Sequence, residues 1–176
     1  MFKQIDTQLK EVRKEMELSQ SKLVMGFTTE MNYDNKYAYM LMSVVLGGTP
    51  SSKLFMNVRE KMSLCYYCVS RLDRNTGVMF VESGVERKNI KNAREAIINQ
   101  IEDIKNGKLT DDEIMSAKLA ICNSYNAVLD SLQGIEFWYL AQTIGADLKT
   151  PKEAVELIMK CNKDEIIKAA KTLKLD

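Results

Sequence analysis

GGTPSSKLFMNVREKMSLCYY, residues 47–67, is the stretch that decides the fold. Its glycine pair frees the backbone for a close approach or a positive φ angle, and the Thr-Pro that follows suits the start of a helix. After Ser63, the sequence Tyr-Tyr-Cys-Val favours a strand. We therefore expect a helix from about residue 51 to residue 61, with Arg59 in its last turn, followed by a strand with Tyr66 at its start. The helix prediction rests on apolar residues at helical spacing: Leu54, Phe55, Val58 and Met62.

The other strand signals also lie in the first half of the chain. Leu23, Met25 and Phe27 alternate with other residues, so we expect them on one face of a strand over residues 22–29. A polar segment containing Asp73, Asn75 and Gly77 then predicts the turn of a β-hairpin. The two strands of this hairpin are expected over residues 66–72 and 78–84.

Helix signals fill most of the second half. Isoleucine and alanine recur at spacings of three and four from Ile90 to Ile104, and Gly107 follows as a helix-ending residue. Three capping signatures begin further helices, at Thr110, Thr150 and Asn162. Two more helices are expected over residues 37–46 and 135–144.

The order of these elements indicates the fold class. Strands come early, helices come late, and there is one hairpin with no βαβ alternation. This order favours an α+β fold, with an antiparallel or mixed sheet and helices packed on one face. Residues 22–176 show no linker or repeat, so we expect one domain preceded by an N-terminal segment, residues 1–21.

Composition excludes several classes of partner. Apolar residues make up 45% and charged residues 28% of the 176 residues, as in an ordinary globular protein. The 25 Lys and Arg are balanced by 24 Asp and Glu, so no nucleic acid or anionic membrane is expected as a partner. No apolar run is long enough to span a bilayer. The charged N-terminus does not resemble a secretory signal, and we expect a cytoplasmic protein.

The chain contains no histidine, which excludes histidine-ligated zinc and Ser-His-Asp triads within it. Of the four cysteines, Cys65 and Cys68 have the C-x-x-C spacing of redox and metal motifs. They follow a predicted helix and enter a strand, where residues three apart face opposite sides. We therefore interpret all four as ordinary buried or half-buried thiols that bind no metal.

The stretch around residues 46–66 resembles the second, non-catalytic lobe of the M16 zinc peptidases, the pitrilysin or insulinase-like family. The resemblance is strongest to the bacterial two-lobed members and covers roughly residues 22–175. It rests on the order and spacing of several short motifs: Leu46-Gly47-Gly48, Ser51-Ser52-x-Leu54-Phe55, Val58-Arg59-Glu60-Lys61, Tyr66, Ser83-Gly84-Val85-Glu86, Thr110-Asp111-Asp112-Glu113, Thr150-Pro151-x-Glu153 and Asp164-Glu165-Ile166.

This resemblance implies an M16 (LuxS/MPP-like) metallopeptidase lobe in which residues 1–21 join two lobes. In the family a final sheet strand follows, here expected after Leu175, so we expect this sheet to lack it. The family's second lobe supplies an arginine and a tyrosine, seven residues apart, that reach across the cleft to substrate. Arg59 and Tyr66 match that spacing, and the loop with Gly47, Gly48 and Ser51 would border the cleft. By residue type alone, Arg59 pairing with a surface acid and Tyr66 packing in the sheet remain open.

The family's zinc-binding H-x-x-E-H motif is absent, so this chain alone is not expected to hydrolyse peptides. We expect a non-catalytic, substrate-binding lobe that pairs with a zinc-bearing lobe, on the same parent chain or on a partner, to enclose and cleave peptides. The zinc would belong to that partner lobe. The alternative is a catalytically inactive peptide-binding or assembly subunit of the same superfamily. The Phe137-Trp138-Tyr139 cluster fits either the core or a contact surface between lobes.

Overall fold

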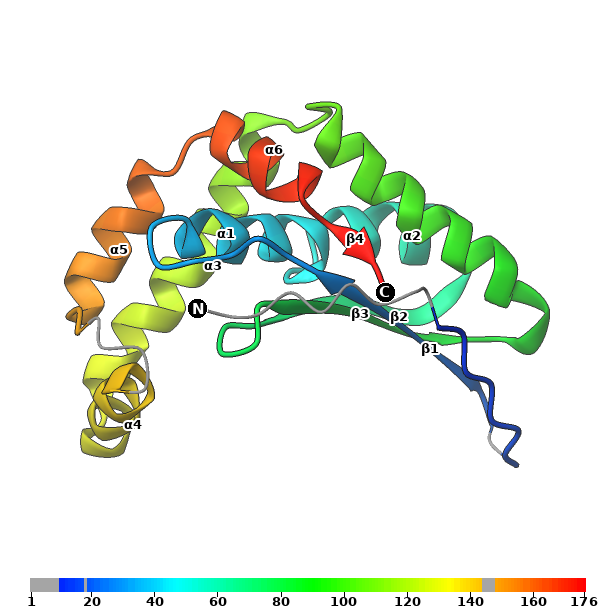
Figure 1. The fold of residues 1–176 in the computed structure, drawn as a ribbon, viewed down its shortest axis with the longest axis horizontal. Coiled ribbons are helices and arrows are strands. Elements are labelled where there is room, and N and C mark those ends of the chain that lie inside the picture. Colours follow the sequence, from blue (N-terminus) through cyan, green and yellow to red (C-terminus); the bar gives the residue numbers. More distant parts are fainter. Residues whose placement is uncertain (1–9, 18, 144–147) are drawn as a thin grey trace.

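The computed structural model describes residues 10–17, 19–143 and 148–176. Its sheet is antiparallel throughout, in the strand order β2-β3-β1-β4. Figure 1 shows the helices arched over one face of this sheet. This arrangement confirms the predicted α+β fold with helices on one face. The strands are β1 (Ser21–Thr28), β2 (Cys65–Asp73), β3 (Val78–Val85) and β4 (Lys174–Leu175).

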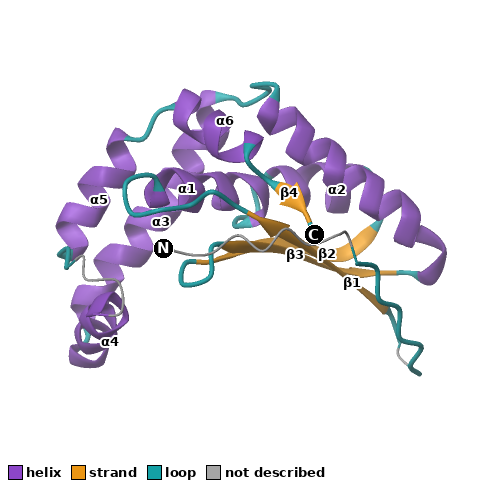
Figure 2. Cartoon of the chain, viewed as in Figure 1, coloured by secondary structure: helices purple, strands orange, loops and turns teal. Residues whose placement is uncertain are grey.

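Helices and short helical turns make up most of the chain after the β2–β3 hairpin, and Figure 2 shows the helices on one side of the strands. The α-helices are α1 (Lys36–Gly47), α2 (Ile90–Lys105), α3 (Asp111–Ala127), α4 (Leu132–Thr143), α5 (Pro151–Lys160) and α6 (Lys163–Lys171). The remaining helical segments are the π-helix η1 (Leu54–Lys61) and the 3₁₀ turns η2 (Arg87–Asn89) and η3 (Val128–Asp130).

The core lies between the sheet and the helices. Met25 and Phe27 of β1 point into it, as the alternation predicts, and Leu23 packs against it. On the neighbouring strand, Met79 and Val81 are completely buried. α1 and α2 pack on this face and α3 packs on α1, so burial of apolar surface holds the two layers together.

Local signals for turns and helix ends are confirmed. Gly77 in the hairpin and Gly107 after α2 both adopt positive φ angles, +69° and +74°, that other residues rarely adopt. Thr110, Thr150 and Asn162 each begin a helix with a complete capping box. In each box the cap side chain accepts from a backbone N–H, and a glutamate accepts from the backbone of the cap residue.

The prediction for residues 51–61 needs correction. Thr49 and Pro50 belong to a turn, closed by a hydrogen bond from Ser52 N–H to the Thr49 carbonyl oxygen (3.0 Å). The helix begins only at Leu54, and its hydrogen bonds run from residue i+5 to residue i, as from Met62 N–H to the Asn57 carbonyl oxygen (3.1 Å). The segment is therefore a π-helix. Met62, which was predicted to lie on the apolar stripe of the helix, is exposed.

The end of the sheet also differs from the expectation. The last strand was expected after Leu175, but β4 begins at Lys174 and pairs Lys174 and Leu175 with Thr28 and Phe27 of β1. Asp176 N–H adds a bond to the Gly26 carbonyl oxygen (3.0 Å). The sheet therefore has a short fourth strand along the last residues of β1.

Candidate functional site

The junction between η1 and β2 holds the residues that the sequence singles out. Ser63 adopts a positive φ of 50°, and Leu64 N–H donates to the Val58 carbonyl oxygen (3.2 Å). This tight reversal turns the chain from helix into strand within three residues. Because the reversal is so short, the last turn of η1 stays beside the first residues of β2.

Arg59 lies in the last turn of η1, as predicted. Its guanidinium carbon sits 4.5 Å from the centre of the Phe55 ring, in a cation–π contact, and its Nη1 lies 3.4 Å from a carboxylate oxygen of Glu60. Of the side chain, 38% remains exposed. The guanidinium is thus held in place on one side and has N–H donors left for a ligand.

Tyr66 is placed by a β-bulge. The β2–β3 register shifts between Cys65 and Tyr67, so Tyr66 is the extra residue without a partner on β3. Its side chain is 55% exposed. Nearby, the pKa of Lys88 is raised by the hydrogen bond and charge of Glu86, with a smaller contribution from Tyr66. The phenol therefore lies at the surface, near the Glu86–Lys88 ion pair.

Both residues flank Cys65. Tyr66 follows it in the chain, and the positive charge of Arg59 is close enough to lower the pKa of the Cys65 thiol. The structure therefore brings Arg59 and Tyr66 to the same helix–strand junction.

The predicted loop lies at the other end of η1. Gly47 ends α1 so close to β2 that an added Cβ would lie 2.6 Å from the backbone nitrogen of Ser70. A Cβ on Gly48 would lie 2.7 Å from the Cα of Val44. Ser51 is exposed, and its hydroxyl contacts that of Thr49 at 3.1 Å. The close backbone approach is confirmed at both glycines, and neither has a positive φ.

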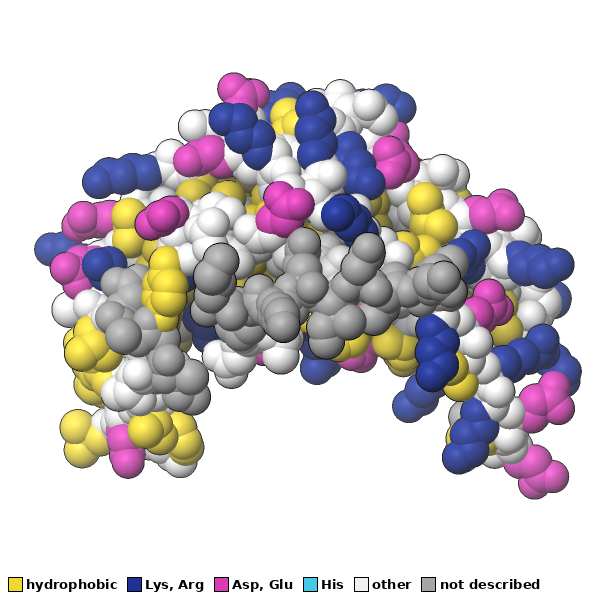
Figure 3. Space-filling view, in the orientation of Figure 1, with side chains coloured by type: hydrophobic (Ala, Val, Ile, Leu, Met, Phe, Trp, Pro, Cys, Tyr) yellow, Lys and Arg dark blue, Asp and Glu magenta, His cyan; other side chains and the backbone are white. Residues whose placement is uncertain are grey.

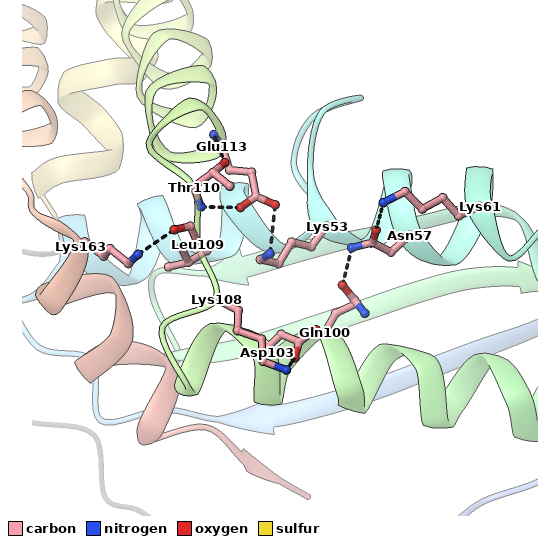
Figure 4. Close-up of polar contacts among 10 residues, drawn as sticks. All are labelled: Lys53, Asn57, Lys61, Gln100, Asp103, Lys108, Leu109, Thr110, Glu113 and Lys163. Atoms are coloured by element: carbon pink, nitrogen blue, oxygen red, sulfur yellow. Dashed lines mark hydrogen bonds and ion pairs between the residues drawn. The ribbon is translucent and has the colours of Figure 1, made fainter.

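Polar contacts that the sequence analysis missed fix η1 against the helical layer (Figure 4). Lys53, just before η1, is buried and donates to a carboxylate oxygen of Glu113 at 3.0 Å. That glutamate also serves the Thr110 capping box, so one carboxylate ties η1 to α3. Asn57 donates to the side-chain oxygen of buried Gln100 on α2 at 2.6 Å. Polar residues at buried helix positions are the only sequence signal for these contacts.

The two cysteines of the C-x-x-C motif do not face opposite sides, which corrects the sequence interpretation. The bulge at Tyr66 adds one residue between them, so both point to the core face. The pKa of Cys65 is lowered to about 7, first by a hydrogen bond from the Cys68 thiol, then by Ser83 and by the charge of Arg59, while burial opposes the shift. The pKa of Cys68 is raised, by the same hydrogen bond and by burial.

Neither a metal site nor a membrane-spanning segment is found in the part of the chain that the structure describes. Over residues 10–17, 19–143 and 148–176, no three His, Cys, Asp or Glu side chains gather to hold a metal ion. The same residues contain no helix with the length and apolar character needed to cross a bilayer. The described side chains therefore do not fit the zinc of an M16 catalytic centre.

Comparison with known proteins identifies the family. The family model for the peptidase M16 inactive domain matches residues 2–121. A Bacillus subtilis protein named "Probable inactive metalloprotease YmfF" is 37% identical over 173 residues, which are 96% of this chain and 40% of that protein. A zinc protease of Rickettsia bellii, itself uncharacterised, is 24% identical over 88% of this chain and 38% of its own length. The chain thus spans about two fifths of these relatives.

Solved structures agree with this assignment. A conserved protein from Enterococcus faecalis superposes with a TM-score of 0.84 at 33% identity, over 95% of this chain and 42% of its own. A peptidase M16 inactive domain from Pseudomonas fluorescens gives a TM-score of 0.77 at 20% identity, over 90% of this chain and 39% of its own. The likeness in fold and the matched family model lead to one conclusion: this chain belongs to the peptidase M16 inactive-domain family.

Proposed function

We propose that this chain is the substrate-binding, non-catalytic lobe of an M16-type zinc metalloendopeptidase. In this proposal it pairs with a zinc-bearing lobe and the two enclose the peptide that is cleaved. One observation carries the proposal: Arg59 and Tyr66 lie at a single helix–strand junction, and both side chains are partly exposed. We also propose a cytoplasmic location for the protein.

The chemistry of this pair suits a peptide carbonyl. A guanidinium and a phenol hydroxyl both donate hydrogen bonds, and a carbonyl oxygen accepts two. Donors aimed at this oxygen orient the peptide and stabilise the negative charge that develops on it during attack. Phe55 and Glu60 hold Arg59 in place, so less side-chain entropy is lost on binding. The loop with Gly47, Gly48 and Ser51 would form a further border of the cleft.

Conservative substitutions in the assembled two-lobed protein test this role. Arg59→Lys keeps the charge but removes the planar fork of donors, and Tyr66→Phe removes only the hydroxyl. We expect each to lower kcat/KM for a fluorogenic peptide by about 10²-fold, the cost of losing one such donor. Tyr33→Phe is a matched control, because Tyr33 is 51% exposed and lies in the loop before α1. Unchanged kcat/KM in both site variants would refute the assignment.

A second candidate function is a peptide-binding or assembly subunit whose parent protein cleaves nothing. The 37% identical relative, whose name describes an inactive metalloprotease, favours it. The same two variants separate the candidates. If the parent protein binds a labelled peptide, loses binding with Arg59→Lys and Tyr66→Phe, and yields no hydrolysis with added zinc, the second candidate holds. Hydrolysis that a chelator abolishes supports the first.

A further inference from the structure

The bulge at Tyr66 changes the meaning of the C-x-x-C motif. Without it, Cys65 and Cys68 would lie on opposite faces of β2. With it, Cys65 pairs with Val85 and Cys68 pairs with Ser83, two residues apart on β3 and on the same face. Partners two residues apart on β3 are about 6.6 Å apart, so the Cα atoms of Cys65 and Cys68 opposite them are expected at a similar separation. Disulfides bridge Cα atoms at this separation.

The two thiols lie in unequal environments. Cys68 is 2% exposed and belongs to the core, whereas Cys65 is only half buried at the start of the strand. The neighbouring Cys68 thiol, Ser83 and the Arg59 charge all lower the pKa of Cys65, and the Ser83 hydroxyl itself donates to the Tyr67 carbonyl oxygen (2.9 Å). Cys68 stays protonated. A half-buried thiol with a lowered pKa thus lies on the same strand face as a buried thiol with a raised pKa.

We propose that Cys65 and Cys68 form a dithiol site that reacts with hydroperoxides, with Cys65 as the attacking thiolate and Cys68 as the resolving thiol. This proposal is independent of the peptide-binding function. The Cys65 sulfur attacks the terminal peroxide oxygen, the O–O bond breaks, and the departing oxygen takes up a proton as water or alcohol. Cys65 becomes a sulfenic acid, and the peroxide is reduced by two electrons.

The second step closes the disulfide. Cys68 loses its proton, its sulfur attacks the Cys65 sulfur, and the S–O bond breaks as the departing hydroxyl takes that proton and leaves as water. The sum is two thiols and one hydroperoxide giving one disulfide, one water and one alcohol (or a second water). Thiol reductants reverse the outcome. Tyr66 lies inside the closed loop, so oxidation would stiffen the backbone beside Arg59.

Peptide mapping of the oxidised chain tests the site. The reduced 176-residue chain is treated with hydrogen peroxide, blocked with iodoacetamide and digested with trypsin, which places both cysteines in one peptide, residues 62–71. We expect that peptide to lose two hydrogens and escape alkylation, and dithiothreitol to reverse both changes. Cys122 and Cys161, whose pKa values are raised by burial, are internal controls expected to remain alkylatable.

Variants assign the two roles. Cys65→Ser should abolish the reaction, whereas Cys68→Ala should stop it at a sulfenic acid on Cys65 that dimedone traps. The proposal is overturned if Cys122 or Cys161 oxidises as fast as the peptide over residues 62–71, or if that peptide remains fully alkylated. It is also overturned if dimedone labels Cys68 in the Cys65→Ser chain. The wild-type map decides the question even if Cys68→Ala fails to fold.

Discussion

Cys65 and Cys68 belong to one short motif, yet the fold shifts the pKa values of their thiols in opposite directions. The sequence interpretation failed here because strand alternation is a local rule, and a bulge interrupts it. The bulge at Tyr66 depends on how β2 pairs with β3, which no pattern within β2 reveals. The sequence interpretation rejected a redox role for Cys65 and Cys68. Their position on the same face of β2 makes that role possible again.

The lowered pKa of Cys65 predicts a pH-dependent contribution to stability. A group whose folded pKa is depressed stabilises the fold fully above its unfolded pKa, about 8.5 for a thiol, and this contribution is lost as the pH falls through about 7. We expect the Tm of the reduced chain, relative to Cys65→Ser, to fall between about pH 9 and pH 6. Thermal unfolding followed by circular dichroism measures this difference.

Cys122→Ser is the control for that experiment. Burial raises the pKa of Cys122, so its contribution has the opposite sign: it is present at low pH and declines as the pH rises. Parallel pH profiles for the two variants would contradict the thiolate environment assigned to Cys65.

The sequence indicates that Gly47 allows a close approach of the backbone, but it does not indicate which segment approaches. Gly47→Ala places a Cβ 2.6 Å from the backbone nitrogen of Ser70 and 2.8 Å from the side chain of Leu54. The backbone of β2 cannot yield cheaply, so we expect a loss of about 1–3 kcal/mol in the free energy of unfolding. Urea denaturation gives the value. Gly26→Ala is the control, because its nearest contact is Phe80 at 3.9 Å, and an equal loss there would refute the argument.

Among the helices and strands, the predictions that depend only on residues close in sequence are the ones that the structure confirms. The capping boxes at Thr110, Thr150 and Asn162 form between residues three apart, so the sequence predicts them fully. The sequence predicted a helix here but not its π form, because the stripe of Leu54 and Val58 suits either form and the choice depends on tertiary contacts. Asn57, donating to Gln100 on α2, is one such contact.

Removing this contact should therefore loosen η1. Asn57→Ala leaves the buried side chain of Gln100 without its partner, and we expect the free energy of unfolding to fall by about 1–3 kcal/mol. Adding Gln100→Leu to Asn57→Ala should cost less than the sum of the two single substitutions. Chemical denaturation of the four chains in this double-mutant cycle measures the coupling. Additive losses would show that the bond does not fix η1.

For the whole molecule, the sequence predicted the order of the elements, the sheet face that carries the core, and the junction that holds Arg59 and Tyr66. Hydrophobic alternation and helical spacing carry that information because each is repeated many times along the chain. The sequence did not predict the features that depend on contacts between distant segments. These are the bulge that exposes Tyr66, the ion pair between Lys53 and Glu113, and the early start of β4. The elements that carry Arg59 and Tyr66 could be predicted from the sequence, but the contacts around these two residues could not.

The space-filling view shows the molecule hollowed beneath the sheet, with α4 projecting at one side of the hollow (Figure 3). α4 has no buried residue and one acid among twelve residues. It is anchored by Trp138, whose ring packs edge-on against Tyr125 and whose Nε1 donates to the Lys149 carbonyl oxygen (2.7 Å). The exposed apolar residues of α4 are Leu132, Phe137, Tyr139 and Leu140. A surface this apolar is typical of an interface.

We expect the proposed zinc-bearing lobe to cover this face, since the relatives extend well beyond the matched two fifths of their length. Leu140→Glu should weaken association with an M16 catalytic lobe at least tenfold, because a charge would be buried there, while Tm stays unchanged. Calorimetric titration measures the affinity. Leu119→Glu on α3, where Leu119 is 51% exposed, is the matched control. Equal weakening by both variants would refute the surface, whereas self-association of the isolated chain that only Leu140→Glu abolishes would identify a second copy as the occupant.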